Sequence, residues 1–422
     1  MQRETIRPAV LAIALTLSTA CCAAAADWPG FRGPYGNGVA DDKEVVTKWS
    51  STENVVWRVP LSNPGNSSPI VSNGRVFLST AADSGKKRSL VCFDRKSGEE
   101  IWTRTVDFAT VEKTHNTNPY GGSTPTSNGE RVVVWHGSAG LYCYDMRGNE
   151  LWAIDLGDFL HQWGYGTSPV IYNDRVILNT GPGKEIFIAA IDLSSGKTIW
   201  RTPEPQEGDG EKNTSGKYMG SWATPLIERV NGEPQVICTL PTRVNGYDPK
   251  SGKLIWSCEG ISGKRGDLAY SSPLVRNGFC VATGGYRGPS IGFEIQTGNL
   301  NSAWRVDENP QSIGSGMFID DDHYVMANAG PATFQCIAAK TGEVVWKESP
   351  KGGKNYWGSI VSGGGHMYVT NQRGDTVVFE PSTEKLKVVQ VNKLGESSNS
   401  TPAIADGQIF IRTFQHLYCI GE

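Results

Sequence analysis

The sequence predicts an all-β protein, an eight-bladed β-propeller built from four-stranded antiparallel blades. Three observations support this fold. A tryptophan-bearing segment recurs every 42 to 56 residues along most of the chain. A Ser/Thr-Pro pair precedes most copies, and tight-turn pairs such as Asn-Gly lie between the expected strands. Gly accounts for 50 of the 422 residues, which is typical of a protein with many turns.

The repeated segment is clearest in CFDRKSGEEIW (92–102), IDLSSGKTIW (191–200) and YDPKSGKLIW (247–256). An acid ends the third strand of each unit, a Ser/Thr-Gly turn follows, and the fourth strand carries the tryptophan. We expect each indole ring to pack between its own blade and the next, and not to stack a cofactor. This tryptophan ladder consists of Trp57, Trp102, Trp152, Trp200, Trp256, Trp304 and Trp346, and the eighth slot, near Val388, has no tryptophan.

The start of each unit is marked by a hydroxyl residue and, in most units, by a proline after it. The markers are Ser68-Pro69, Thr124-Pro125, Ser168-Pro169, Thr224-Pro225, Ser272-Pro273 and Thr401-Pro402, with Gly316-Met317 and Ser359-Ile360 as degenerate copies. These markers define eight units. In the seventh unit Thr383-Glu384 replaces the Ser/Thr-Gly turn, so we expect a blade with a looser junction.

The ring is predicted to close through two segments that are far apart in the sequence. The unit that begins at Thr401 shows no fourth strand. The predicted tryptophan-bearing strand VVWRVPL (55–61) precedes the first unit and therefore has no blade of its own. Pairing the two removes the exposed sheet edges. We therefore expect a propeller over residues 55–422 and an N-terminal extension over 27–54.

Residues 1–26 have the pattern of a cleaved secretory signal. Arg3 and Arg7 precede an apolar run, and Ala24-Ala25-Ala26 offers a cleavage site. Lipid attachment at Cys21 is a less favoured alternative. No later segment is long and apolar enough to predict a membrane span. We expect an exported protein of the periplasm or cell envelope.

Charge and cysteine positions exclude several classes of function. The chain has 40 Lys and Arg against 43 Asp and Glu, so it lacks the basic surface that nucleic-acid binding requires. Cys92, Cys143, Cys336 and Cys419 occupy a slot of mostly small residues two positions before the acid slot, which predicts buried packing residues without metal-ligand spacing. The sequence does not decide whether two of the residues Cys238, Cys258 and Cys280 form a disulfide.

The Asp-x-x-Ser/Thr-Gly-x-x-x-Trp signature, in eight units, resembles the pyrroloquinoline-quinone (PQQ) type repeat of quinoprotein alcohol dehydrogenases. It equally resembles that of their non-catalytic, BamB-like relatives. The resemblance covers residues 55–422, and it implies the fold more specifically than the function.

For the dehydrogenases the resemblance implies PQQ with Ca²⁺ held by a Glu, an Asn and an Asp, an Asp base, and a disulfide between adjacent cysteines. The one adjacent pair, Cys21-Cys22, lies in the predicted signal segment, and the strand starts GTSPVIYN and SWATPLIE lack the Glu. Asp267 alone stands where a family acid could lie, and it is a weak candidate. We expect no catalytic residue, no metal and no cofactor, with PQQ and Ca²⁺ as the alternative.

The longest connections all fall on one face of the predicted ring, which makes that face the candidate binding surface. His115 and His161 have no partner at metal-ligand spacing, so we expect both to be solvated loop histidines. For any single residue, packing of the loop onto the ring is the alternative. The candidate ligand-binding residues are His115, Asn118, Tyr120, His161, Trp163, Tyr165, Lys217, Trp222, Arg265, Tyr270, Tyr356 and Trp357.

These observations favour a non-catalytic binding or scaffolding module, a monomer whose loop-rich face engages an envelope protein or polymer. The alternative is a divergent PQQ-dependent dehydrogenase that oxidises an alcohol or a sugar.

Overall fold

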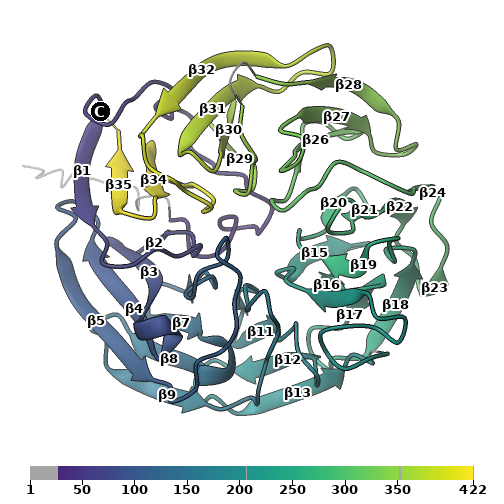
Figure 1. Cartoon of the computed structure of the whole chain (residues 1–422), viewed down its shortest axis with the longest axis horizontal. Helices are drawn as coiled ribbons and strands as arrows, with labels where there is room; N and C mark the ends of the chain where they lie inside the picture. Colours follow the sequence, from purple (N-terminus) through teal and green to yellow (C-terminus); the bar gives the residue numbers. More distant parts are fainter. Residues whose placement is uncertain (1–26, 206, 351–352, 422) are drawn as a thin grey trace, which may run out of the picture.

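A computed structural model shows eight antiparallel sheets arranged around a central axis, one after another in chain order (Figure 1). The structure describes residues 27–205, 207–350 and 353–421. The predicted eight-bladed, all-β fold is confirmed. The predicted signal segment 1–26, with Cys21, lies outside the described residues. No helix in the described part of the chain has both the length and the apolar character needed to cross a membrane.

The first four blades each run from an inner to an outer strand. Blade 1 contains β2 (Ile70–Ser72), β3 (Arg75–Ala82), β4 (Lys87–Asp94) and β5 (Glu100–Asp107). Blade 2 contains β6 (Thr126–Ser127), β7 (Arg131–Trp135), β8 (Leu141–Asp145) and β9 (Glu150–Ile154). Blade 3 contains β10 (Val170–Tyr172), β11 (Arg175–Asn179), β12 (Phe187–Asp192) and β13 (Thr198–Pro203). Blade 4 contains β15 (Leu226–Val230), β16 (Glu233–Thr239), β17 (Arg243–Tyr247) and β18 (Leu254–Glu259), and β23 (Gly298–Leu300) pairs with its outer edge.

The remaining blades follow the same order. Blade 5 contains β20 (Leu274–Arg276), β21 (Phe279–Thr283), β22 (Ser290–Glu294) and β24 (Trp304–Val306). Blade 6 contains β25 (Met317–Phe318), β26 (His323–Ala327), β27 (Phe334–Ala338) and β28 (Val344–Glu348). Blade 7 contains β29 (Val361–Gly363), β30 (His366–Thr370), β31 (Asp375–Glu380) and β32 (Lys387–Lys393). Blade 8 contains β33 (Ala403–Ala405), β34 (Gln408–Arg412), β35 (His416–Ile420) and β1 (Val55–Pro60). Outside the blades, β14 (Tyr218–Ser221) pairs with β19 (Gly266–Ala269), and 3₁₀ turns η1 (Asp83–Gly85) and η2 (Gly137–Ala139) lie in loops.

The tryptophan ladder joins neighbouring blades through both packing and hydrogen bonding. Trp152 is typical: its Nε1 donates to the Leu193 carbonyl oxygen of the next blade at 3.0 Å. Its ring lies against Gly196, where an added Cβ would lie 2.8 Å from the indole and where φ is +73°, so only glycine fits this turn. Trp256 differs, because its Nε1 donates to Gln235 of its own blade. As in Trp152, the indole N–H donates to a backbone carbonyl oxygen of the next blade in Trp57, Trp102, Trp200, Trp304 and Trp346.

A ring of hydroxyl groups joins the blades at their inner ends. Ser68 N–H donates to Thr124 Oγ1 at 3.0 Å, and the same bond recurs from blade to blade until Thr401 N–H donates to Ser68 Oγ at 3.0 Å. At one junction the bond is different, because Ser272 Oγ donates to the Thr224 carbonyl oxygen. In the sixth blade the position belongs to Ser315, one residue before the expected marker. This hydroxyl ring consists of Ser68, Thr124, Ser168, Thr224, Ser272, Ser315, Ser359 and Thr401.

Removing one hydroxyl of this ring should destabilise the fold. In Ser168→Ala the buried Thr124 N–H loses its acceptor at 3.0 Å, which should lower the free energy of unfolding by about 1 to 3 kcal/mol. Urea unfolding measures the change. Ser194→Ala, in an exposed turn, is the control and should change stability by less than about 1 kcal/mol. Equal effects of the two substitutions would contradict a role of the ring in joining the blades.

Blade 7 is confirmed as a four-stranded blade in spite of its irregular turn. Trp346 still reaches it, because its Nε1 donates to the Ser382 carbonyl oxygen at 3.0 Å. The strand register pairs Gln390 with Val378, so Gln390 occupies the vacant tryptophan slot, two residues beyond the expected Val388.

Trp49 of the N-terminal extension fills the place of the missing ladder tryptophan. Its side chain is 2% exposed and its ring stacks on Tyr368 of blade 7, with centroids 6.4 Å apart and planes 21° apart. Trp49 N–H donates to Asn392 Oδ1 at 2.9 Å. Its hydrophobic cluster includes residues of both blade 7 and blade 8. The expectation of a looser junction here was therefore wrong, because a residue outside the repeat packs at the junction.

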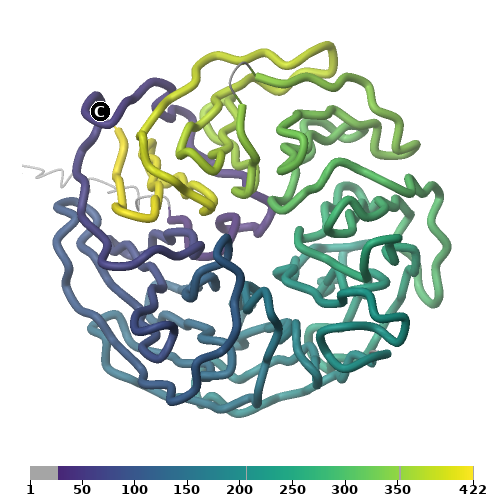
Figure 2. Tube along the Cα trace, viewed as in Figure 1, coloured from purple at the N-terminus to yellow at the C-terminus, as the bar shows by residue number. Residues whose placement is uncertain are grey.

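The extension crosses the ring before it enters β1. Figure 2 shows this purple trace near the ring centre and then beside the yellow and yellow-green blades. Arg32 is buried on the way and donates through Nη2 to the Gly316 carbonyl oxygen at 2.6 Å. Backbone bridges hold the extension to blades 1 and 7 at Trp28 with Val71, Val39 with Ser362, and Ser50 with Lys393.

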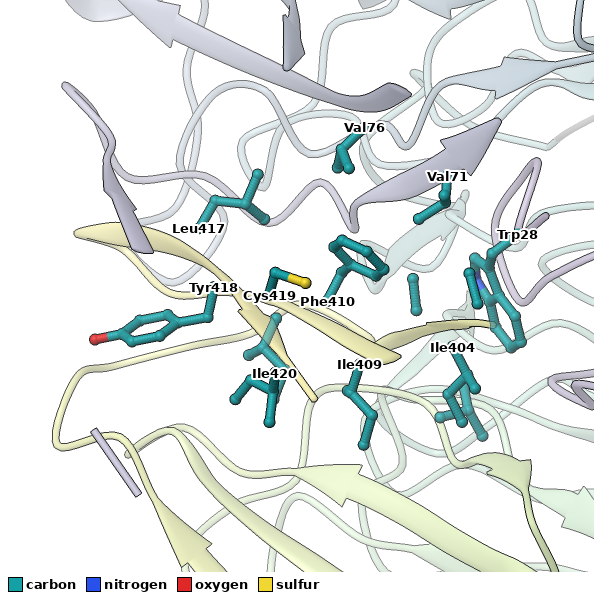
Figure 3. Packing of buried hydrophobic residues seen from close by; sticks show 14 of the residues in the cluster. Trp28, Val71, Val76, Ile404, Ile409, Phe410, Leu417, Tyr418, Cys419 and Ile420 are labelled. Atoms are coloured by element: carbon teal, nitrogen blue, oxygen red, sulfur yellow. The ribbon is translucent and has the colours of Figure 1, made fainter. Parts of the chain in front are cut away.

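The ring closes as predicted, with β1 as the outer strand of blade 8. Trp57 of β1 pairs with Cys419 of β35 in antiparallel register. Figure 3 shows the apolar cluster at this closure, in which Phe410 lies among residues of blade 1 such as Val71. All the cysteines of the described chain are buried and free, which includes Cys238, Cys258 and Cys280.

Candidate functional site

A cavity of about 440 Å³ lies at the centre of the loop-rich face. We call it the central cavity. Phe31 of the extension lines it, as does every member of the hydroxyl ring except Ser272. Ser272 differs because its hydroxyl donates to Thr224. The other seven hydroxyls accept a backbone N–H, and the described residues offer no acceptor for their own protons. The inner end of the cavity therefore presents hydroxyl donors around one aromatic ring.

A second tier of residues lines the cavity two positions before each hydroxyl. Side chains two residues apart in an extended chain point to the same side, so these residues stand above the hydroxyl ring. In blade order this upper tier is Asn66, Gly122, Gly166, Trp222, Tyr270, Ile313, Trp357 and Asn399.

Loop side chains occupy the space left by the two glycines of the upper tier. An added Cβ at Gly122 would lie 3.1 Å from Asn118 Oδ1, and one at Gly166 would lie 3.3 Å from the Trp222 ring. The loops before blades 2 and 3 bring His115, Thr117, Asn118 and Trp163 to the cavity wall.

Four aromatic residues form one side of the central cavity. The Trp163 ring centroid lies 5.8 Å from that of Trp222 and 6.3 Å from that of Tyr286, and the Trp222 and Tyr270 centroids are 5.4 Å apart. Trp222 Nε1 donates to the Gly164 carbonyl oxygen at 2.8 Å, which fixes the indole. Burial raises the pKa of the Tyr270 phenol, so this side stays uncharged around neutral pH.

Amide side chains form the opposite side. In the ring of eight, blades 8 and 1 lie across from blades 4 and 5 (Figure 1). Asn399 and Asn66 precede blades 8 and 1, whereas Trp222 and Tyr270 precede blades 4 and 5, and all four residues line the cavity. Asn66 and Asn399 both donate through Nδ2 to the Thr117 carbonyl oxygen at 2.9 Å. The buried Oδ1 of Asn66 has no donor among the described residues. The central cavity is thus aromatic on one side and amide-lined on the other.

The structure brings half of the candidate residues to the central cavity. They are His115, Asn118, Trp163, Trp222, Tyr270 and Trp357. Lys217 and Arg265 are exposed and do not line it, although the Arg265 guanidinium lies 5.6 Å from the ring centroid of Tyr286.

The other candidates support the loops from beneath. Tyr165 and Tyr356 are buried, and Tyr120 is half-buried with its hydroxyl donating to the Glu112 carbonyl oxygen. His161 is 3% exposed, with its ring 4.9 Å from that of Trp222, so the expectation of a solvated His161 was wrong. Burial lowers the pKa of His161 to about 4, which leaves a neutral packing residue behind the aromatic side. His115 is exposed, as expected.

A buried ion pair anchors the loop that carries His115 and Asn118. Arg88, which is fully buried, pairs with Glu112 of this loop, and its Nε donates to the Gly85 carbonyl oxygen at 2.9 Å. The guanidinium lies 5.2 Å from the Tyr165 ring centroid. This cluster connects blade 1 to the loops before blades 2 and 3 and so positions part of the cavity wall.

Several cavity residues were not among the predicted ones. Phe31, Asn66, Tyr286, Gln311 and Asn399 all line the central cavity. Asn66 and Asn399 could have been found by reading two positions before each hydroxyl marker. Phe31 carries no such signal, because it lies outside the repeat.

Asp267 lies in a separate side pocket and not in the central cavity. The side pocket has a volume of about 700 Å³ and is lined by Glu204, Arg243, Glu259 and Asp267, among others. Asn213 Nδ2 donates to Asp267 Oδ2 at 2.8 Å. This placement separates the one candidate acid from the aromatic wall.

Glu204 of the side pocket should make stability depend on pH. Burial raises the pKa of Glu204 from 4.5 to about 7, although Arg243, 2.9 Å away, opposes the shift. Between these values the folded protein holds a proton that the unfolded chain has released, so the free energy of unfolding should fall as the pH rises from about 4.5 to 7. The full shift corresponds to about 3 kcal/mol. Urea unfolding at several pH values measures the slope, and Glu204→Gln should flatten it; an unchanged slope would exclude Glu204 as its source.

The residues that line the central cavity do not fit a calcium-bound quinone. PQQ carries three carboxylates, which call for cationic partners, and Ca²⁺ calls for carboxylate oxygen ligands. Among the described residues of the cavity wall there is no Asp, Glu, Lys or Arg. The described residues also contain no group of three His, Cys, Asp or Glu that could hold a metal ion.

Comparison with known proteins gives a matching family and similar folds. The family model described as outer membrane protein assembly factor BamB matches residues 86–348. No curated protein matches the chain. BamB from Moraxella catarrhalis is 16% identical, with 87% of this chain and 99% of that chain covered and a TM-score of 0.60. The quinohemoprotein alcohol dehydrogenase from Comamonas testosteroni is 12% identical, with 93% and 80% covered and a TM-score of 0.64. At these identities the similarity of the structures establishes the fold alone.

Proposed function

Because the chain belongs to the family described as outer membrane protein assembly factor BamB, we propose that it is a non-catalytic binding module of the cell envelope. It engages a protein or polymer partner through the loop-rich face. One observation carries this proposal: the central cavity combines fixed aromatic and amide side chains with a wall whose described residues include no acid–base pair. Such a wall suits recognition, which uses aromatic area and a few placed polar groups.

The chemistry of the wall supports binding over catalysis. Among the described residues of the wall, His115 carries the one imidazole, and its Nδ1 lies 2.8 Å from Thr117 Oγ1 of the same loop. A general base acts with a second group that orients it or takes part in the reaction, and the described residues of the wall offer no carboxylate for that role. The proposal also places the mature protein in the periplasm or envelope, after removal of residues 1–26.

Site-specific photo-cross-linking in cells tests the face that binds. A benzoylphenylalanine at Tyr286, on the cavity wall, should form adducts with an envelope component. The same group at Lys250, in an exposed tight turn of the opposite face, is the matched control and should form none. Adducts from position 250 alone would overturn the assignment of the loop-rich face.

The alternative function is a quinoprotein dehydrogenase, which the fold of the Comamonas testosteroni enzyme favours. We expect the purified protein, mixed with PQQ and Ca²⁺, to take up no quinone and to show no dye-linked alcohol oxidation, because the described part of the cavity wall has no cationic partner for the carboxylates. Equilibrium dialysis measures quinone uptake, and a dye-reduction assay measures alcohol oxidation. Stoichiometric quinone uptake that Asp267→Ala abolishes would replace our proposal with the dehydrogenase.

A further inference from the structure

We infer that the central cavity binds a neutral saccharide, with one sugar ring stacked on the aromatic side and its oxygens hydrogen-bonded to the Ser68 and Thr401 hydroxyls on the amide side. This inference rests on the proposed function and names the ligand class of the same site. Four features of the described cavity wall carry it: its lack of charge, its aromatic side, its amide side and its hydroxyl groups.

The lack of charge selects the class of ligand. No Lys, Arg, Asp or Glu lines the cavity within the described residues, and the Arg265 guanidinium lies 5.6 Å from the ring centroid of Tyr286 without lining the cavity itself. An anionic ligand would lose hydration here without gaining an ion pair, which is unfavourable. A neutral ligand has no such cost.

The aromatic side matches the apolar face of a pyranose ring. Trp163 and Trp222 are half-buried, so part of each indole is open to a ligand. Trp222 is already held by its bond to Gly164, and its position is supported from behind by His161. A rigid platform of this kind binds with little loss of side-chain entropy. Sugars with equatorial hydroxyls present a flat face of C–H groups that suits stacking on such rings.

The polar groups match ligand hydroxyls, which both donate and accept hydrogen bonds. The buried Oδ1 of Asn66 is an acceptor without a donor among the described residues. The hydroxyl protons of Ser68 and Thr401 lack acceptors there, because these oxygens already accept backbone N–H groups. The Asn66 oxygen is buried out of a ligand's reach, so the groups open to ligand oxygens are the hydroxyl protons of Ser68 and Thr401 on the same side of the cavity.

The binding test uses the full mature chain and four defined probes. Calorimetric titration should detect cellotetraose or tetra-N-acetylchitotetraose, which are neutral and have equatorial hydroxyls. It should detect neither tetragalacturonic acid, which is the charged control, nor a tetrapeptide of glycine and serine. Binding of tetragalacturonic acid alone, or of the peptide alone, would overturn the inference.

Substitutions at the aromatic side locate the binding. Trp163→Ala and Tyr286→Ala should each weaken saccharide binding at least tenfold, whereas Trp163→Phe should keep most of it. Tyr35→Ala is the control, because Tyr35 is 52% exposed and does not line the cavity. Circular dichroism melting shows whether each variant folds, and Trp163→Phe keeps the test informative if an alanine variant does not. Saccharide binding that no cavity variant alters would contradict the site.

Failure of this inference differs from failure of the proposed function. If neither neutral tetrasaccharide binds while position 286 still gives cross-links, the saccharide is excluded and a protein partner takes its place. If cross-links come from position 250 alone, the proposed function fails as well.

Discussion

Replacing Trp49 with alanine should lower the free energy of unfolding by about 3 to 5 kcal/mol, the usual cost of truncating a buried aromatic residue. Trp49 is 2% exposed and stacks on Tyr368 where the ladder lacks its eighth tryptophan. The substitution would leave a cavity at the junction of blades 7 and 8, next to the ring closure. Urea unfolding followed by circular dichroism measures the effect.

Trp163→Ala provides the comparison for this prediction. Trp163 is also a large aromatic residue of a connecting segment, but it is half-buried at a cavity wall. Its removal should cost clearly less stability. If Trp49→Ala proves no more destabilising than Trp163→Ala, the extension does not replace a ladder residue.

Glu112→Ala should also cost about 3 to 5 kcal/mol, because it leaves the guanidinium of Arg88 buried without its counter-charge. Arg88 is completely buried and Glu112 is 7% exposed. Since Glu112 belongs to the loop that carries His115 and Asn118, the variant should also weaken binding at the central cavity. Urea unfolding measures the first effect and calorimetric titration the second.

A double variant separates lost charge from lost packing at this pair. Arg88→Met with Glu112→Leu removes both charges and keeps much of the apolar volume, so it should be more stable than Glu112→Ala alone. Strictly additive losses from the two positions would show that the ion pair does not couple them.

The fold could be predicted from the sequence because a propeller blade is encoded locally. The acid, the turn glycine and the tryptophan lie within one short segment, as at Asp94, Gly98 and Trp102. In the structure Asp94 Oδ1 accepts the N–H groups of Lys96 and Ser97, which forms the turn, and Gly98 lies against the preceding Trp57. The local sequence of each repeat therefore encodes both its own hairpin and the packing of its turn glycine against the tryptophan of the preceding blade.

The cavity could be predicted only in part, because its wall combines residues from every blade, from the loops between blades and from the N-terminal extension. Trp222 and Trp357 were identified by their place in long loops, whereas Asn66 and Asn399 occupy the same upper-tier position without a distinctive side chain. The direction in which a loop folds is set by packing, as the burial of Tyr165 and Tyr356 shows. Composition alone does not distinguish such supports from residues that face the cavity.

The junction of blades 7 and 8 shows a further limit of prediction from the sequence. The missing tryptophan was visible as a gap in the repeat, but its substitute, Trp49, comes from a segment without repeat markers. A contact between residues so distant in sequence leaves no local pattern.

The closure of the ring also sets the order in which the chain can fold. β1 is synthesised well before its partner, since Pro60 pairs with His416. Until β33–β35 emerge, β1 has no strand to pair with, while blades 1 to 7 can already form from local hairpins. Non-local pairing of this kind slows folding, and the last step should be the slowest. A nascent chain is therefore an open arc whose end blades expose apolar sheet faces, and it is most exposed to aggregation just before it is complete.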